Sequence, residues 1–361
     1  MSGNARLARP LPEPRADLGL REGYHSAQVP VEVRLNTNES PYPPPREWVE
    51  ALADVARDIS FNRYPDRSAW ALRQALAQWH GVRPEQVFAA NGSNEVLQSL
   101  CLAYGGPGRV AAMFEPTYAL HAHIAHLTAT EIVQGRRRPD FALDLNAALE
   151  IIEKSSPSIV FLCSPNNPTG LVEDETTISA VVAHAPGLVV VDEAYGQFAS
   201  WSALELVDDG VPLVVVRTYS KTWSMAGMRL GYMVAPAEVV KVMERVVLPY
   251  HLDVLKQAAG RLALQFSGQM EDRVATIIAE RERLVAALSR LPVQVWPSQA
   301  NFVLWRPLQR RGSDVWEGLV QRSVLVRDTS SWPGLEGCLR TTVGTPAEND
   351  RFLSALAEVL S

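Results

Sequence analysis

Polar side chains at the ends of short apolar runs suggest a site that handles an amine and an anion. Lys221 follows such a run beside hydroxyl residues, and Arg229 stands eight positions further on. Asp192 ends another run, and Tyr195 follows three residues later. Burial and a nearby cation keep a lysine partly neutral, and a neutral lysine can form a Schiff base with an aldehyde. These residue types therefore point to covalent chemistry at Lys221.

The same part of the sequence can hold a cofactor with a pyridine ring and a phosphate. An acid must face the nitrogen of a protonated pyridine ring, and Asp192 is the candidate. A phosphate is bound by hydroxyls, an arginine and a helix N-terminus. Ser220 and Arg229 supply the first two, and the turn 91–94, which precedes the helical pattern 95–102, supplies the third. The combination predicts a pyridoxal 5'-phosphate site.

Continuous apolar runs alternate with helical patterns through the middle of the chain. The runs predict buried strands at 158–163, 187–192, 212–217 and 229–234. Uninterrupted apolar strands with helical crossovers are typical of a mostly parallel sheet covered on both faces, so the predicted class is α/β, doubly wound. Ligands of such sheets bind beyond the carboxyl ends of the strands, where the polar residues stand.

The rest of the chain predicts an arm and a second domain. Residues 1–45 are proline-rich and lack helical periodicity near their end, which indicates an extended arm that lies partly in a small domain. A large cofactor-binding domain is expected at 46–246, and a smaller α+β domain at 247–361. Helices are predicted at Arg46–Ile59 and Ser68–His80, with Ser68 as the N-cap of the second.

Composition argues against several classes of partner. The 361 residues carry a net charge of −6, which provides no general basic field for nucleic acid. No stretch approaches the roughly 18 apolar residues of a membrane span. Three cysteines at unpatterned positions favour neither disulfides nor a metal site, and they fit a reducing cytoplasm: Cys101, Cys163 and Cys338.

Longer motifs resemble the aminotransferases built on the aspartate-aminotransferase fold. The central ones are Ser164–Gly170, Asp192–Tyr195, and Lys221 with Arg229. Within this class, the chain resembles the histidinol-phosphate aminotransferases from the arm to the last helix. The further motifs are Leu35–Glu39, Arg63–Asp66, Asn91–Glu95, Leu248–Leu252, Ala300–Val303 and Leu339–Arg340. The resemblance implies that fold, pyridoxal phosphate as the cofactor, and a homodimer with shared active sites.

The resemblance also implies roles for individual residues around the cofactor. Tyr118 would stack on the ring, Asn167 and Tyr195 would contact its 3-oxygen, and Asp192 would face its nitrogen. Tyr64 would reach the phosphate from the other subunit. The remaining phosphate contacts implied by the resemblance are Ser93, Asn94, Thr218, Ser220 and Arg229.

A second implied set binds the substrates, an amino donor and 2-oxoglutarate. Arg327 and Arg340 would face the phosphate of the donor, and the same pair could hold the carboxylates of glutamate and 2-oxoglutarate. Tyr24 would close over the site from the arm. Tyr250 would add a hydroxyl, and Asn167 would contribute from the cofactor side.

The implied reaction converts histidinol phosphate and 2-oxoglutarate into imidazole-acetol phosphate and glutamate, a step of histidine biosynthesis, with Lys221 as general base. Ser40 and the segment 328–337 depart from the family pattern, which leaves the natural donor open. Alternatives are an aminotransferase for aromatic amino acids such as phenylalanine, and a lyase or decarboxylase for a phosphorylated amino acid. A non-catalytic binding protein is disfavoured because Lys221, Asp192 and Tyr195 are all present.

Overall fold

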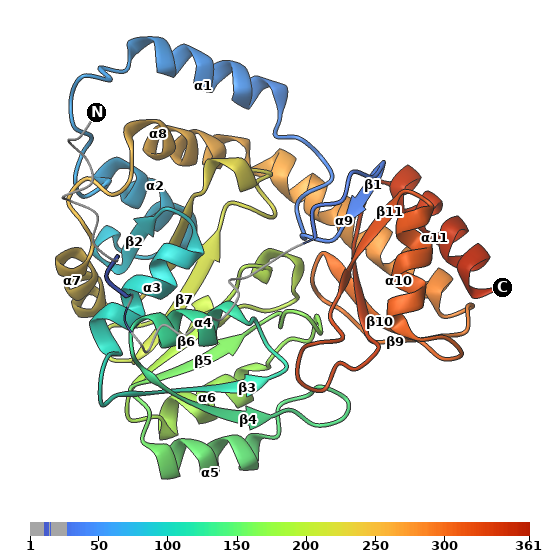
Figure 1. Cartoon of the computed structure of the whole chain (residues 1–361). Helices are drawn as coiled ribbons and strands as arrows, with labels where there is room; N and C mark the ends of the chain where they lie inside the picture. The colour runs from blue at the N-terminus through green and yellow to red at the C-terminus, as the bar shows by residue number, and fades with distance from the viewer. Residues whose placement is uncertain (1–10, 14, 16–26) are drawn as a thin grey trace, which may run out of the picture.

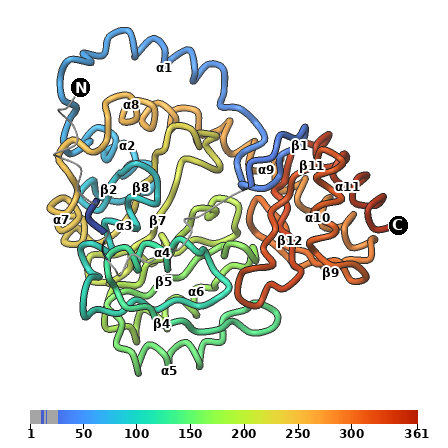
Figure 2. The backbone as a smooth tube through the Cα atoms, in the orientation of Figure 1, coloured from blue at the N-terminus to red at the C-terminus, as the bar shows by residue number. Residues whose placement is uncertain are grey.

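The computed structural model describes residues 11–13, 15 and 27–361. This part of the chain forms two layered units that lie side by side (Figures 1 and 2). One is built on a seven-stranded sheet and the other on a five-stranded sheet. The predicted α/β class with a second, smaller unit is confirmed.

The seven-stranded sheet is mostly parallel. Its strand order is β2-β8-β7-β6-β5-β3-β4, and β8 runs antiparallel to both of its neighbours while the other pairs are parallel. The four apolar runs of the sequence form its strands β5 to β8, as predicted. The strands are β2 (Val87–Ala90), β3 (Val110–Glu115), β4 (Glu131–Arg136), β5 (Ile159–Cys163), β6 (Leu188–Asp192), β7 (Leu213–Thr218) and β8 (Gly231–Val234).

Helices cover both faces of this sheet, which explains the uninterrupted apolar runs. Val190 of β6 belongs to the hydrophobic cluster on one face, and its neighbours Val189 and Val191 belong to the cluster on the other. Full burial of one such side chain stabilises the fold by about 1.5–3 kcal/mol. The first face is covered by α3 (Ser93–Tyr104), α4 (Leu120–Leu127) and α7 (Ala237–Val246), and the second by α5 (Leu145–Ser155) and α6 (Glu175–His184).

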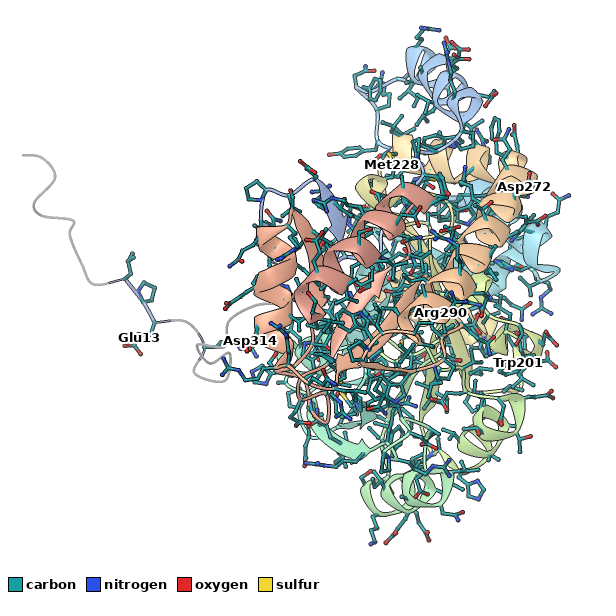
Figure 3. All side chains as sticks on the ribbon, turned by 90° about the vertical axis from the view of Figure 1, so that its right-hand side faces the viewer. Glu13, Trp201, Met228, Asp272, Arg290 and Asp314 are labelled. Carbon is teal, nitrogen blue, oxygen red and sulfur yellow. The ribbon has the colours of Figure 1, made fainter. Side chains whose placement is uncertain are left out.

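The second sheet combines the arm with the C-terminal part of the chain. Its strand order is β1-β11-β12-β10-β9, and β1 pairs in parallel with β11. The strands are β1 (Val33–Leu35), β9 (Val293–Val295), β10 (Phe302–Pro307), β11 (Val324–Asp328) and β12 (Leu339–Thr342). Three helices pack against them: α9 (Ser267–Leu288), α10 (Gly312–Gln321) and α11 (Pro346–Leu360). Figure 3 shows this side, with Asp272 on α9 and Asp314 on α10.

Three more helices stack at the β2 end of the large sheet: α2 (Trp70–His80) contacts β2, α8 (Val254–Ala263) packs on α2, and α1 (Arg46–Asp58) packs on α8. Both predicted helices after the arm are therefore confirmed, but the predicted Ser68 cap is wrong. A left-handed Ala69 precedes α2, and the Asp66 carboxylate accepts the N–H groups of Ser68 at 2.9 Å and of Trp70 at 2.7 Å. A charged acceptor satisfies the helix start in place of the serine hydroxyl.

The domain divisions at 46–246 and 247–361 remain predictions. Helix α8 lies after residue 246 and yet contacts α1 and α2, whereas α9 contacts the strands of the second sheet. We therefore propose that α8 belongs to the large domain and that the division falls near the start of α9. In the part of the chain described here, no helix is long and apolar enough to cross a bilayer.

Candidate active site

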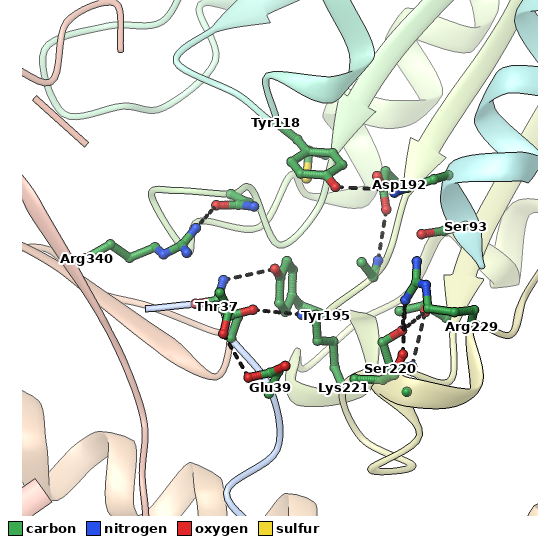
Figure 4. Close-up of a pocket in the computed structure, with 18 residues that line it drawn as sticks. Thr37, Glu39, Ser93, Tyr118, Asp192, Tyr195, Ser220, Lys221, Arg229 and Arg340 are labelled. Atoms are coloured by element: carbon green, nitrogen blue, oxygen red, sulfur yellow. Dashed lines mark hydrogen bonds between the residues drawn. The ribbon is translucent and has the colours of Figure 1, made fainter. Parts of the chain in front are cut away.

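A cavity of about 340 Å³ lies where strands of the large sheet end and the arm passes close to β12 (Figure 4). The parallel sheet brings the ends of β5, β6 and β7 to one edge, so residues far apart in sequence meet there. The cavity brings together most of the site residues predicted from the sequence: Ser93, Asn94, Tyr118, Asn167, Asp192, Tyr195, Thr218, Ser220, Lys221, Arg229 and Arg340.

Lys221 places its amino group inside this cavity. Its Nζ donates a hydrogen bond to the backbone oxygen of Thr37 at 3.1 Å and lies 5.9 Å from the centre of the Tyr195 ring. Burial lowers the pKa of Lys221 to about 8, helped by the positive charges of Arg340 and Arg229. Near pH 8, the Lys221 side chain is therefore the neutral, nucleophilic amine in a large fraction of the molecules.

The lowered pKa of Lys221 predicts a pH-dependent cost to the stability of the cofactor-free protein. The unfolded chain holds this proton up to about pH 10.5, whereas the folded chain releases it near pH 8. The free energy of unfolding therefore rises with pH between these values, and below pH 8 it is lower by about 3 kcal/mol than above pH 10.5. We expect Lys221→Met to stabilise the cofactor-free protein at pH 7, and its advantage to shrink by pH 9.5.

Urea unfolding at the two pH values measures this difference. Lys154→Met is the control, because Lys154 is exposed and pairs with Glu150 on α5. The expected charge burial would be contradicted if Lys221→Met were less stable than wild type at pH 7. It would also be contradicted if the difference in stability between the variant and wild type were the same at both pH values.

Asp192 lies at the end of β6 and is held on both carboxylate oxygens. Oδ1 accepts the N–H of Ala194 at 3.1 Å, and Oδ2 lies 3.0 Å from Nε2 of His121. An ionised carboxylate only accepts hydrogen bonds, so His121 Nε2 carries the proton of this contact. The imidazole is fully buried and stacks on the Phe161 ring, with centroids 4.9 Å apart. Asp192 is thereby fixed in orientation.

His121 was missed in the sequence analysis. It is one of three histidines in the segment Leu120–Leu127, and no motif distinguishes it from the others. Its spacing of three residues from Tyr118 was the available signal, because a turn can bring such residues together, and the N–H of His121 donates to the backbone oxygen of Tyr118 at 3.0 Å at the start of α4. The structure brings the two rings edge to face, with centroids 5.4 Å apart.

Asn38 is a second site residue that was not predicted from the sequence, although the motif Leu35–Glu39 contains it. Its Nδ2 donates to the hydroxyl of Tyr195 at 2.9 Å, and its Oδ1 accepts from the hydroxyl of Thr342 on β12 at 3.0 Å. Asn38 thus ties the arm, the large sheet and the small sheet together at the cavity. Burial raises the pKa of Tyr195 well above its usual value, so the side chain stays a phenol that can donate its proton.

One end of the cavity is built for an anion. Arg229 Nη1 donates to Ser220 Oγ at 3.3 Å, and Thr218 Oγ1 donates to the same oxygen at 3.0 Å. Ser93 begins α3, whose N-terminus favours negative charge. Gly92 has a φ of +83°, and a Cβ there would lie 2.9 Å from Arg229 Nη2. A side chain at position 92 would crowd the guanidinium. Only glycine therefore leaves room for an anion among Ser93, Ser220 and Arg229, which together form the anion cradle.

Arg340 occupies another side of the cavity and is only 2% exposed. Its guanidinium donates to Asn167 Oδ1 and, at 2.9 Å, to the backbone oxygen of Asn36. Arg327 pairs with Arg340 in register between β11 and β12. Its guanidinium lies 5.9 Å from the centre of the Trp332 ring, and the residue is not part of the cavity lining. Arg340 therefore lines the cavity, and Arg327 does not.

Two other predicted residues, Tyr64 and Tyr250, also lie outside the lining. The rings of Tyr64 and Tyr250 stack on each other at the surface, with centroids 4.5 Å apart and an angle of 16° between their planes. Tyr64 is 81% exposed, so it contributes nothing to the cavity of its own chain. Tyr24 lies outside the described residues.

The cavity suits pyridoxal phosphate in its chemistry. It presents an amine at Lys221, a fixed carboxylate at Asp192 and an anion cradle around Arg229. These are the groups required by an aldehyde, a pyridine nitrogen and a phosphate, respectively. Among residues 11–13, 15 and 27–361, no group of three or more His, Cys, Asp or Glu side chains could hold a metal ion.

Comparisons with known proteins agree with this chemistry. The family described as aminotransferase class I and II matches residues 30–356. The histidinol-phosphate aminotransferase of Thermobifida fusca is 46% identical over 349 residues, covering 95% of this chain and 94% of the relative. That of Corynebacterium diphtheriae is 43% identical, covering 96% of both chains.

A solved structure supports the fold. The histidinol-phosphate aminotransferase of Sinorhizobium meliloti, in complex with pyridoxal 5'-phosphate, superposes with a TM-score of 0.84 at 22% identity and covers 91% of each chain. The expected aspartate-aminotransferase-like fold is confirmed. The chain belongs to the class I and II aminotransferases, a family of pyridoxal-phosphate-dependent enzymes.

Proposed function

We propose that this aminotransferase moves the amino group of histidinol phosphate to 2-oxoglutarate and yields imidazole-acetol phosphate and glutamate in histidine biosynthesis. Relatives at 43% and 46% identity over nearly the whole chain carry the corresponding name. The observation that carries the proposal is the buried Arg340 guanidinium, which lines the same cavity as Lys221. A buried guanidinium facing a cavity favours an anionic substrate.

The cofactor supplies an electron sink for negative charge that develops on the carbon next to the transferred amine. We assign Asp192 to its ring nitrogen, where the carboxylate fixed by His121 favours the protonated ring. Tyr118 would cover the ring, and Asn167 and Tyr195 would contact its 3-oxygen. The phosphate contacts in this proposal are Ser93, Asn94, Thr218, Ser220 and Arg229.

Lys221 would hold the cofactor through its aldehyde, and its amine is the proposed general base that moves the proton of the donor carbon. With a pKa of about 8, its amine can accept a proton from the donor carbon near pH 8 and then return it. Thr37 fixes the direction of Nζ through its backbone oxygen. Tyr195 keeps its own proton and can donate it to the 3-oxygen, because Asn38 occupies an acceptor position on the phenol oxygen.

On the substrate side, we assign Arg340 and Asn167 to the anionic group next to the reacting carbon. The same pair can hold a carboxylate of 2-oxoglutarate in the second half of the reaction. Arg327, one strand further along, is the proposed second contact for the phosphate of the donor. Tyr24 and Tyr250 remain proposed contacts from the arm and from the loop before α8.

We also propose a homodimer with shared active sites. The stacked rings of Tyr64 and Tyr250 are exposed on a single chain, which is what a contact with a second subunit requires. Tyr64 would then reach the phosphate in the partner's site. Sedimentation at the mass of one chain at micromolar concentration would refute this assembly. The cytoplasm is the proposed compartment, since the three cysteines are buried and free.

Two arginine variants test the donor. A charge-assisted hydrogen bond to an anion contributes about 1.5–3 kcal/mol, which corresponds to roughly ten- to a hundredfold in kcat/KM. We expect Arg327→Ala to lower kcat/KM for histidinol phosphate by this factor, and to lower kcat/KM for phenylalanine far less. Arg340→Ala should reduce kcat/KM for every anionic donor and for 2-oxoglutarate. Steady-state kinetics with these three substrates measures the ratios, and the exposed Arg290→Ala serves as the control.

The same panel separates the competing functions. An equal loss for all donors in Arg327→Ala, or a wild-type preference for phenylalanine, would instead support an aromatic aminotransferase. Release of carbon dioxide or phosphate from a phosphorylated amino acid without 2-oxoglutarate would support a lyase or decarboxylase.

A further inference from the structure

Asn91 joins three segments behind the anion cradle. It follows β2 directly, and its Nδ2 donates to Glu95 Oε2 in the first turn of α3 at 2.9 Å and to the backbone oxygen of His251 at 2.7 Å. Its Oδ1 accepts a hydrogen bond from Lys256 Nζ of α8 at 2.8 Å. The amide group is therefore engaged through both its nitrogen and its oxygen, although Asn91 is not part of the cavity lining.

These contacts determine the path of the turn that carries the cradle. The backbone N–H of Asn91 also donates to Glu95 Oε2, which closes the turn onto α3. Gly92 follows in the left-handed region, where Arg229 lies against it, and Ser93 then enters the cavity lining. A displacement of Asn91 would therefore shift Ser93 and the space that Arg229 occupies.

The segment 251–256, which Asn91 contacts, is itself anchored to β2 and α8. His251 Nε2 lies 3.0 Å from the backbone oxygen of Ala89, and its ring stacks on Phe88 of β2. Lys256 lies in the first turn of α8 and forms an ion pair with the helix cap Asp253 at 2.9 Å. Its ammonium group is thus held in one place, between the cap of α8 and the side-chain oxygen of Asn91.

We propose that Asn91 and Lys256 are positioning residues for the phosphate of pyridoxal phosphate. They act without touching it, by holding the turn 91–94 against Arg229. The inference rests on the proposed placement of the phosphate at Ser93 and Arg229. It predicts that the two residues matter for a ligand that carries a phosphate and not for the same ligand without one.

The test compares pyridoxal phosphate with pyridoxal, which has the same ring and aldehyde. Dissociation constants of both are measured on the cofactor-free, full-length protein for wild type, Asn91→Ala and Lys256→Met. One hydrogen bond contributes about 0.5–1.5 kcal/mol net, or roughly two- to tenfold in affinity. We expect pyridoxal phosphate to bind about tenfold more weakly to Asn91→Ala and about threefold more weakly to Lys256→Met, while pyridoxal affinity stays within about twofold.

Lys241→Met is the matched control, because Lys241 also pairs with a carboxylate three residues earlier, on Glu238 of α7. Unchanged binding of pyridoxal phosphate in both test variants, or an equal loss for pyridoxal, would overturn the inference. If Asn91→Ala does not fold, Lys256→Met alone decides. If wild type itself binds the two ligands equally well, the placement of the phosphate is wrong, and the inference fails together with that part of the proposed function.

Discussion

Lys221→Ala is expected to abolish transamination, with kcat/KM at least about 10⁴-fold below wild type. A positioned general base alone contributes roughly 10²–10⁴-fold, and this residue also supplies the covalent attachment. Within the described residues that line the cavity, Lys221 is the only lysine. No neighbouring amine can therefore take over either task.

Borohydride reduction followed by peptide mapping checks the attachment directly. Wild type should carry pyridoxal phosphate on the peptide that contains Lys221, and Lys221→Ala should carry none. Lys154→Ala, which changes an exposed lysine on α5, should be labelled like wild type. Covalent trapping elsewhere together with appreciable turnover in Lys221→Ala would show that another lysine is the attachment point.

The strands that build the site could be predicted because their burial pattern is unusual. β6 contains three successive valines, so the strand is apolar on both of its faces. Such a pattern is typical of a sheet that is covered by helices on both sides. Once the strands are known, Asp192 and Lys221 must lie near one edge, since neighbouring parallel strands end there. Local sequence and topology together were sufficient for this part of the site.

The residues that were missed depend on tertiary contacts that no local pattern records. His121 is distinguished only by Asp192, which lies 71 positions away in the chain. Asn38 and Tyr195 are 157 positions apart. Arg327 and Arg340 look alike in the sequence, yet adjacent strands direct them to different surroundings, and only Arg340 lines the cavity. Tyr64 has its proposed role only in an assembly of two chains.

Asp192→Ala is expected to lower kcat by about 10²–10³-fold, while the cofactor stays bound through Lys221 and the cradle. Preorganised charge next to a site of developing charge is worth this much in an enzyme interior. Asp192 is 1% exposed, so its carboxylate acts away from bulk water, where its charge is screened least. Near-normal turnover would refute its assignment to the ring nitrogen. Asp140→Ala, which removes an exposed carboxylate paired with Arg138, is the control.

A chemical rescue separates the charge of Asp192 from its structural role. A cofactor analogue with a methyl group on the ring nitrogen keeps its positive charge without an acid, and the alanine variant leaves room for the methyl group. We expect this analogue to restore part of the lost kcat in Asp192→Ala and to give wild type no benefit, because the methyl group would meet the carboxylate held by His121 and Ala194. If the analogue restores nothing while circular dichroism and cofactor content match wild type, Asp192 acts by fixing His121 and the end of β6 rather than by its charge on the ring.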